Sequence, residues 1–175
     1  KMKDDALSVL SNFVVEDSYT ITMYDINWHQ GVVGIVASRL KEKYYRPTII
    51  FAKDGSGLLK GSGRSISSFH LKDALDLISK RNPDLILTFG GHAMAAGLTI
   101  KEDNFNIFCT EFEVVAKRLL SQDDLNLVTE FDKSIPKELL NHETIMAINS
   151  QVWGQGFPAP VFFWSVRCSS ARNCC

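Results

Sequence analysis

Apolar residues recur along the chain at the three- and four-residue spacing that is typical of amphipathic helices. The spacing predicts three helices: one that ends at Pro47, one that ends near Arg81 and one that Asp103 can cap. Residues 1–13 show a similar spacing and are expected to form the end of a longer helix. The apolar positions of the three helices are, in order, Val33, Val36, Ala37 and Leu40; Leu71, Ala74, Leu75 and Ile78; and Phe105, Phe108, Phe112, Val115 and Leu119.

Short runs of β-favouring residues separate these helices. They lie at residues 19–23, 48–52, 58–63, 85–89 and 98–100. The turn cluster Asp-Gly-Ser-Gly at 54–57 predicts that the second and third runs form a hairpin. Strands that alternate with helices indicate an α/β domain.

The predicted domain organisation has four parts. Residues 1–17 are the end of a linking helix, residues 18–120 the α/β domain, residues 121–163 a shorter region and residues 164–175 an atypical tail. The shorter region begins with an acidic link and is expected to hold a strand near 127–131 and a helix over 136–148. About fifty residues cannot easily build a second complete core.

The composition is that of an ordinary soluble globular protein: 45% of the 175 residues are hydrophobic, 22% are charged and the formal net charge is -1. We expect no membrane partner, because no apolar run approaches the ~20 residues of a membrane helix. Cys109 stands apart from three cysteines in the last eight residues, so neither a disulfide framework nor a zinc site is expected. These features predict a cytoplasmic protein, and the start at Lys1 suggests a fragment.

The small net charge conceals an asymmetry. Residues 39–81 carry ten Lys or Arg against four Asp or Glu, a net of +6, and the rest of the chain sums to -7. A basic stretch in a neutral protein is typical of a surface for phosphates. The alternative is that several of these lysines are simply solvent-exposed residues on helix faces.

The segment 89–97, Phe-Gly-Gly-His-Ala-Met-Ala-Ala-Gly, is the first candidate site. Gly90 and Gly91 let a ligand approach the backbone. If a helical turn begins at His92, its free N–H groups make a seat for an anion, with the imidazole as an additional donor. The alternative is a tight strand-to-helix turn in which His92 is half-buried.

Two further segments are candidates for phosphate contact. In Gly61-Ser-Gly-Arg-Ser65, Arg64 can offer a planar donor fork that small neighbours do not obstruct. The alternative is a hairpin edge with a solvent-facing arginine. Before the first helix, an exposed Trp28 could stack on a base while the helix N-terminus near Gln30 meets a phosphate; more often such a Trp is packed.

Catalytic motifs are missing from the sequence. The four histidines form no metal-binding pair, no Asp-rich cluster is present, and Gly-x-Ser-x-Gly does not occur. The glycines at 55–63 fit neither the dinucleotide fingerprint nor the P-loop. We therefore expect no catalytic or metal-binding residue in this chain.

Several of these segments together resemble the RecJ family of single-strand-specific 5′→3′ DNA exonucleases, which belongs to the DHH phosphoesterases. The resemblance extends from about Ser18 to Phe163. It rests on the order and spacing of segments 28–39, 45–48, 61–65, 70–75, 89–97 and 153–160, which include Trp-His-Gln-Gly, Gly-Ser-Gly-Arg-Ser and Phe-Gly-Gly-His.

The resemblance implies a fold and a division of labour. Residues 18–120 would be the DHH-associated C-terminal domain, a mixed sheet with flanking helices, and 121–163 an incomplete α+β or OB-type stub. Two Mn²⁺ or Mg²⁺ ions would sit in a separate N-terminal DHH domain that is absent from this chain. The expected phosphate and nucleic-acid contacts are Ser62, Gly63, Arg64, Ser65, Gly90, Gly91, His92, Trp28 and Gln30.

Three hypotheses follow. The first is a substrate-binding lobe for single-stranded DNA in an exonuclease of repair and recombination, which binds but does not cut without the DHH domain. The second is a lobe of a DHH phosphodiesterase for short or cyclic dinucleotides. The third is a non-catalytic docking domain for repair proteins through a partly exposed Phe-rich helix from Phe105; it fails if that helix is buried.

Overall fold

The computed structural model describes residues 17–128, 131–154 and 158–164. Its contacts divide the chain into two compact units, residues 1–127 and 128–175, which we describe separately. Within the described residues, no helix is long and apolar enough to cross a membrane. The segment expected to be the end of a helix, residues 1–13, lies outside the described residues, as does almost all of the predicted tail.

The first unit is built on one five-stranded sheet with the order β1-β2-β3-β5-β4. β1 runs parallel to β2, and the other neighbouring pairs are antiparallel. The predicted mixed sheet is therefore confirmed. The strands are β1 (Ile21–Asp25), β2 (Thr48–Lys53), β3 (Leu58–Arg64), β4 (Thr88–Gly91) and β5 (Ala95–Lys101).

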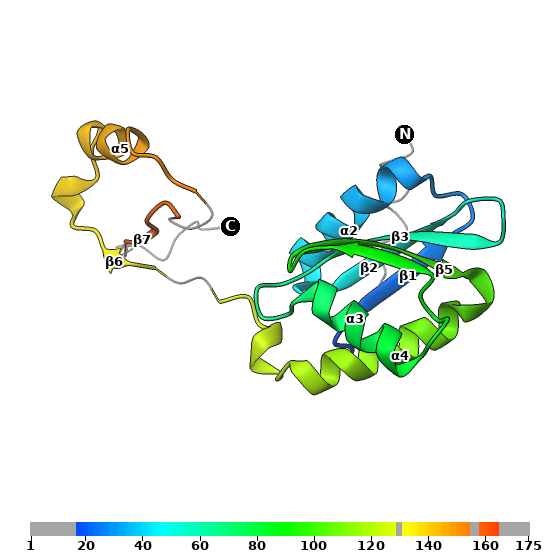
Figure 1. The fold of residues 1–175 in the computed structure, drawn as a ribbon. Helices are drawn as coiled ribbons and strands as arrows, with labels where there is room; N and C mark the ends of the chain where they lie inside the picture. Colours follow the sequence, from blue (N-terminus) through cyan, green and yellow to red (C-terminus); the bar gives the residue numbers. More distant parts are fainter. Residues whose placement is uncertain (1–16, 129–130, 155–157, 165–175) are drawn as a thin grey trace, which may run out of the picture. The chain divides into compact units, whose positions relative to one another are not determined.

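Helices cover both faces of this sheet (Figure 1). The helix α2 (Gln30–Tyr44) packs on one face, where Ile50 and Ala52 of β2 point. The helices α3 (Leu71–Arg81) and α4 (Phe105–Leu119) pack on the other, where Ile49 and Phe51 point. Successive side chains of a strand alternate between faces, so one strand serves both layers. The three helices lie where the apolar spacing places them.

Phenylalanines fill the larger of the two layers. Phe108 and Phe112 of α4 are 0% exposed, and their rings stack with centroids 5.8 Å apart. Phe51 and Phe69 meet these rings edge-on at 5.5 and 5.9 Å, a favourable aromatic geometry. The phenylalanines on which the docking hypothesis depends are therefore not offered to a partner, because Phe108 and Phe112 form the core and Phe105 packs against it, although Ile107, Val114 and Leu119 of the same helix are exposed.

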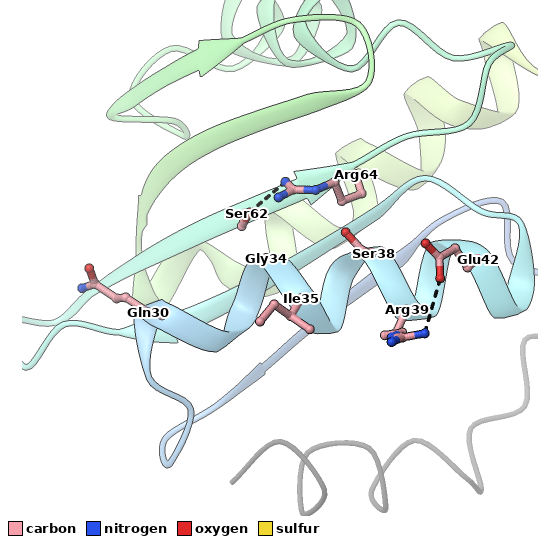
Figure 2. A pocket seen from close by; sticks show the side chains of 9 residues that line it. Gln30, Gly34, Ile35, Ser38, Arg39, Glu42, Ser62 and Arg64 are labelled. Atoms are coloured by element: carbon pink, nitrogen blue, oxygen red, sulfur yellow. Dashed lines mark hydrogen bonds and ion pairs between the residues drawn. The ribbon is translucent and has the colours of Figure 1, made fainter. Parts of the chain in front are cut away.

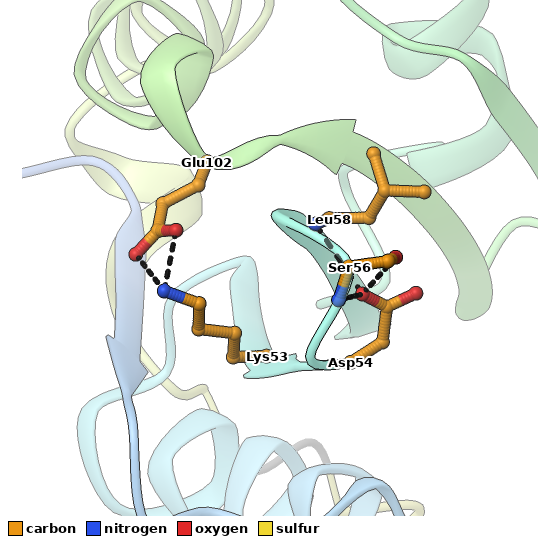
Figure 3. Close-up of polar contacts among 5 residues, drawn as sticks. All are labelled: Lys53, Asp54, Ser56, Leu58 and Glu102. Atoms are coloured by element: carbon orange, nitrogen blue, oxygen red, sulfur yellow. Dashed lines mark hydrogen bonds and ion pairs between the residues drawn. The ribbon is translucent and has the colours of Figure 1, made fainter.

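The β2–β3 hairpin is held at its tip by polar contacts (Figure 3). The Asp54 carboxylate accepts hydrogen bonds from the Ser56 amide (2.9 Å) and hydroxyl (2.6 Å) and from the Leu58 amide (3.3 Å). Lys53 forms an ion pair of 2.6 Å with Glu102, in the 3₁₀ turn η2 (Glu102–Asn104) after β5. These contacts tie the hairpin to the strand that lies beside it.

Some element boundaries differ from those predicted. Leu85 and Ile86 are buried, but they precede β4 as irregular backbone, so burial and not strand pairing explains their apolar character. Asp103 lies within η2 and does not cap α4, whose N-cap is Asn104 without a side-chain hydrogen bond. The first unit continues to residue 127 because Leu125, in η3 (Asp123–Leu125), packs into the core.

The second unit contains a two-stranded parallel sheet, β6 (Lys133–Ser134) and β7 (Phe162–Phe163). The helix predicted over 136–148 is divided into η4 (Lys137–Leu139) and α5 (His142–Asn149), because Asn141 caps the second part through the Thr144 amide. Residues 127 and 128 form no strand, and 129–130 lie outside the described residues. No described residue of this unit is buried.

Candidate nucleic-acid interface

A groove of about 580 Å³ lies between α2 and β3 (Figure 2). Successive residues of β3 point to opposite faces of the sheet. Leu59, Gly61 and Gly63 face the α3–α4 layer. The groove side of the strand therefore has Lys60, Ser62 and Arg64. Residues one helical turn apart on α2 form the opposite wall. The groove is lined by Gln30, Gly31, Gly34, Ile35, Ser38, Arg39, Glu42, Ser62 and Arg64.

The guanidinium group of Arg64 is held in this groove from one side. Its Nη1 donates to the Ser62 hydroxyl (3.1 Å) and to the Gly63 carbonyl (2.8 Å). Among the described residues, no hydrogen bond or ion pair engages Nη2 or Nε. A guanidinium has five N–H donors in a fixed fork, so the remaining donors suit a planar or tetrahedral oxyanion. The structure thus brings Ser62 and Arg64 together as the sequence predicts.

The two neighbours of this pair have other roles. Ser65 is 0% exposed; its hydroxyl donates to the Phe69 carbonyl at 2.6 Å and its amide to the Met94 carbonyl at 3.0 Å. Gly63 is buried, and a Cβ there would lie 2.6 Å from the Leu71 side chain. The prediction that Ser65 contacts a ligand is wrong, because its polar groups are used inside the fold. Gly63 contributes only the carbonyl that holds Arg64.

The N-terminus of α2 differs from the predicted site. The imidazole Nδ1 of His29 caps the helix by accepting from the Gly31 amide at 3.1 Å. Trp28 is 9% exposed and packs with Val33, Val36 and other residues of the α2 layer. The predicted stacking platform is therefore wrong, because burial of the indole ring contributes to the core. Gln30 is exposed and lines the groove as expected.

The glycine-rich segment 89–97 is a β-hairpin and not a helix start. β4 and β5 pair antiparallel, and the His92 amide donates to the Ala95 carbonyl at 2.8 Å. Gly91 has a φ of 147°, and a Cβ there would meet the Ala95 carbonyl at 2.3 Å, so glycine is required. Both the predicted anion seat at a helix N-terminus and the alternative strand-to-helix turn are wrong. His92 is exposed beside the turn.

Gly90 and Gly97 leave part of the sheet surface without side chains. They pair with each other, and Gly97 pairs with Ser62, so the three residues form a row across β3, β5 and β4 on the face of the groove. Both glycines are exposed; a Cβ at Gly90 would meet nothing within 4 Å, and one at Gly97 only a carbonyl at 3.9 Å. Packing within the described residues does not demand glycine at either position. We call Ser62, Gly97 and Gly90 the glycine row.

The basic stretch 39–81 does not form one surface. Of its ten cations, four pair with carboxylates, Arg46 and Arg64 donate to groups of the fold, and Lys43 lies over the Tyr44 ring, so most have partners within the fold. Lys60 and Arg64 share the face of the groove, and Arg39 lines it. Gly34, Ser38 and Glu42 also line the groove and were not predicted; their spacing of four residues along one helix is the signal that indicates a shared face. The four ion pairs are Arg39–Glu42, Lys53–Glu102, Lys80–Asp76 and Arg81–Glu111.

The described residues offer no donor set for a divalent cation. No group of three His, Cys, Asp or Glu side chains gathers anywhere in that part of the chain. Mn²⁺ and Mg²⁺ prefer several oxygen ligands in one place, so the residues present do not fit these ions.

Comparison with known proteins places this geometry in a family. The model of the DHHA1 domain matches residues 12–118. The single-stranded-DNA-specific exonuclease RecJ of Haemophilus influenzae is 45% identical over 165 residues, covering 92% of this chain and 29% of that protein. RecJ of Escherichia coli is 44% identical over 143 residues, covering 81% and 25%. The chain therefore spans between a quarter and a third of the length of these relatives.

Solved structures agree with these matches. The crystal structure of RecJ from Thermus thermophilus in complex with Mn²⁺ is 30% identical with a TM-score of 0.73, over 92% of this chain and 23% of that one. A structure of exonuclease RecJ bound to manganese is 34% identical with a TM-score of 0.57, over 67% and 28%. With a mixed sheet, flanking helices and the glycine-rich β4–β5 hairpin in place, this chain belongs to the DHHA1 domain family and is similar, within it, to the RecJ exonucleases.

Proposed function

We propose that this chain is the substrate-binding lobe of a single-stranded-DNA exonuclease and that the α2–β3 groove holds a phosphate of the strand. The free donors of Arg64 beside the Ser62 hydroxyl carry this proposal. Charge-assisted hydrogen bonds from a guanidinium to phosphate are among the stronger polar contacts available to a protein. The similarity to RecJ supports the assignment of the substrate class.

The glycine row extends the proposed contact beyond one phosphate. It runs from Ser62 in the groove to Gly90 at the edge of the sheet, across two strand spacings or about 10 Å. Surface without side chains lets a sugar-phosphate backbone lie close to the peptide groups. Lys60 and Thr99 lie in the neighbouring row of the same face and add polar groups beside that path.

Recognition of this kind is independent of base sequence. Contacts to phosphate and sugar position a strand but carry no sequence information. The one aromatic predicted to stack on a base, Trp28, is buried in the α2 layer. We therefore expect oligonucleotides of different sequence and equal length to bind with similar affinity.

We propose that hydrolysis depends on divalent cations held outside this chain. The described residues do not fit such ions, whereas the similar RecJ structures contain Mn²⁺ or Mg²⁺. The chain would then bind single-stranded DNA without cutting it, and a DHH domain in cis would complete the 5′→3′ exonuclease. A role in repair and recombination belongs to the same proposal and rests on the resemblance. A cytoplasmic location is also proposed, on the cysteine usage and apolar pattern of the sequence.

Binding of a fluorescent 5′-phosphorylated 12-mer to the full chain, measured by anisotropy at several salt concentrations, tests the proposal. Arg64→Ala should weaken binding and reduce the slope of log affinity against log salt by about one unit. Arg118→Ala is the matched control, because Arg118 is exposed on α4, in the layer on the opposite face of the sheet. Equal salt slopes for the two variants would remove Arg64 from the site.

Two further measurements separate the alternatives. A dinucleotide that binds as tightly as the 12-mer would favour a phosphodiesterase for short substrates and would contradict an extended contact along the glycine row. Release of nucleotides from the 12-mer by the purified chain with Mn²⁺ would contradict the proposed division of labour.

A further inference from the structure

The interior of α2 contains a glycine, Gly34, whose presence the helix itself does not explain. Glycine destabilises a helix interior relative to alanine. Gly34 is the fifth residue of Gln30–Tyr44, and its backbone is not among the positive-φ positions of the described residues. An alanine would therefore suit the helix better than the residue that is present.

The reason lies across the groove. A Cβ at Gly34 would lie 3.2 Å from Arg64 Nη2 and 3.3 Å from Ser62 Oγ (Figure 2). Ordinary van der Waals contact of a Cβ atom begins near 3.4 Å, so both distances are slightly too short. The two groups that would crowd an added methyl are the two that hold the proposed phosphate.

Movement of either group would disturb hydrogen bonds that hold the two together. Arg64 Nη1 donates to both the Ser62 hydroxyl (3.1 Å) and the Gly63 carbonyl (2.8 Å), so the guanidinium is fixed on the side away from its free donors. Displacing Nη2 by a few tenths of an ångström would turn the whole planar group and misalign these bonds. The hydroxyl of Ser62 would have to rotate with it.

We propose that Gly34 is a positioning residue for phosphate binding: its missing side chain leaves room for the guanidinium of Arg64 and the hydroxyl of Ser62 at the floor of the groove. This inference rests on the proposed function of Arg64. Gly34 itself provides no donor; it acts through Arg64. A methyl group at this position should weaken binding without weakening the helix.

A double-mutant cycle tests the inference in the full chain. Gly34→Ala should weaken binding of the 5′-phosphorylated 12-mer about fivefold, because it disturbs one charge-assisted contact without removing it. Gly34→Ala combined with Arg64→Ala should bind no more weakly than Arg64→Ala alone. Gly154→Ala is the control, because an added Cβ there meets nothing within 4 Å, and it should bind as the unchanged chain does.

Thermal unfolding gives a readout that does not depend on DNA. The midpoint of Gly34→Ala should equal or exceed that of the unchanged chain. If the methyl group lowers the midpoint instead, removal of the guanidinium in the double variant should restore it, since the crowding acts through Arg64.

The outcomes distinguish the inference from the proposed function. Unchanged binding in Arg64→Ala overturns the proposed function, and the inference with it. Weaker binding in Arg64→Ala but unchanged binding in Gly34→Ala overturns the inference alone. Equal losses for Gly34→Ala with and without Arg64 also overturn it, because the glycine would then act independently of the guanidinium.

Discussion

Arg46 joins backbone segments that are far apart in the sequence. Its Nε donates to the Ser18 carbonyl at 2.9 Å, and its Nη1 donates to the carbonyls of Tyr44, Tyr45 and Leu125, the last at 2.7 Å. Burial lowers the pKa of this guanidinium, against the raising influence of Glu113 and Tyr19. Arg46 is one of the ten cations of the basic stretch 39–81, yet it serves the fold by joining Ser18, before β1, to Leu125 in η3.

Replacing Arg46 by alanine should therefore cost stability and not DNA affinity. The substitution takes a charged donor away from four carbonyls. A single hydrogen bond to a charged group typically contributes roughly 1.5–3 kcal/mol to the free energy of unfolding. We expect a loss of about 2 kcal/mol in the free energy of unfolding, measured with urea, after water replaces some of these bonds. Arg118→Ala on α4 should lose much less. An Arg46→Ala chain that unfolds at the same urea concentration as the unchanged chain would contradict this role.

At the scale of elements, the β2–β3 hairpin sets the register on which the groove depends. Ser62 pairs with Ile50 of β2 and Gly97 of β5, and a slip by one residue would turn Ser62 and Arg64 to the α3–α4 face. The Asp54 carboxylate fixes the turn by accepting hydrogen bonds. These bonds lower the pKa of Asp54 below its ordinary value of 3.8, and the bond from the Ser56 hydroxyl has the largest effect.

The lowered pKa of Asp54 predicts how the hairpin responds to pH. A carboxyl group whose pKa is lower in the folded chain stabilises it above the unfolded value of 3.8, and this contribution is lost as the pH falls through the folded pKa. Asp54→Ala should therefore be less stable than the unchanged chain near neutral pH, and the difference should shrink below pH 3.8. Urea unfolding of both chains, from neutral pH to below pH 3.8, measures this difference in stability.

Ser56→Ala provides the matched variant for this experiment. It removes the hydroxyl that lowers the pKa of Asp54 most and keeps the carboxylate, so the pH dependence should become shallower. If the gap between Asp54→Ala and the unchanged chain is the same at all pH values, the carboxylate charge does not stabilise the turn.

At the scale of the whole molecule, the two units differ in what they bury. The first contains both core layers. The second has no buried residue among those described, and several of its large apolar side chains are exposed, including Val152 at 92% and Phe131 at 57%. Because burial of apolar surface is the main favourable term in folding, the stability of the chain resides in the first unit.

Removal of residues 128–175 should consequently leave the fold intact. We expect residues 1–127 to unfold in one cooperative transition with a thermal midpoint within a few degrees of the full chain. Circular dichroism at 222 nm follows the transition. A large drop in the midpoint, or loss of cooperativity, would show that the second unit contributes to the core of the first.

The sequence by itself determined those elements whose pattern is local. The apolar stripes of α2, α3 and α4 and the turn at 54–57 need only neighbouring residues, so their positions agree with prediction. Ser62 and Arg64 were also predictable as a pair, because residues two apart in a strand point to the same face. In the three helices, burial and amphipathic spacing express the same physical preference, with the exception of Leu119, which is 51% exposed.

Tertiary structure alone decided the remaining features of the site. The segment 90–97 has glycine and alanine without a periodic pattern, so only pairing of β4 with β5 makes it a hairpin. Trp28 and Ser65 lie in connecting segments, and their burial depends partly on distant residues: Trp28 packs in a layer that includes Ile50 of β2, and the Ser65 amide donates to the Met94 carbonyl. The importance of Gly34 arises from a contact with Arg64 thirty residues later. Local patterns determine where backbone hydrogen bonds form, whereas contacts between distant segments determine which polar groups remain free to bind a ligand.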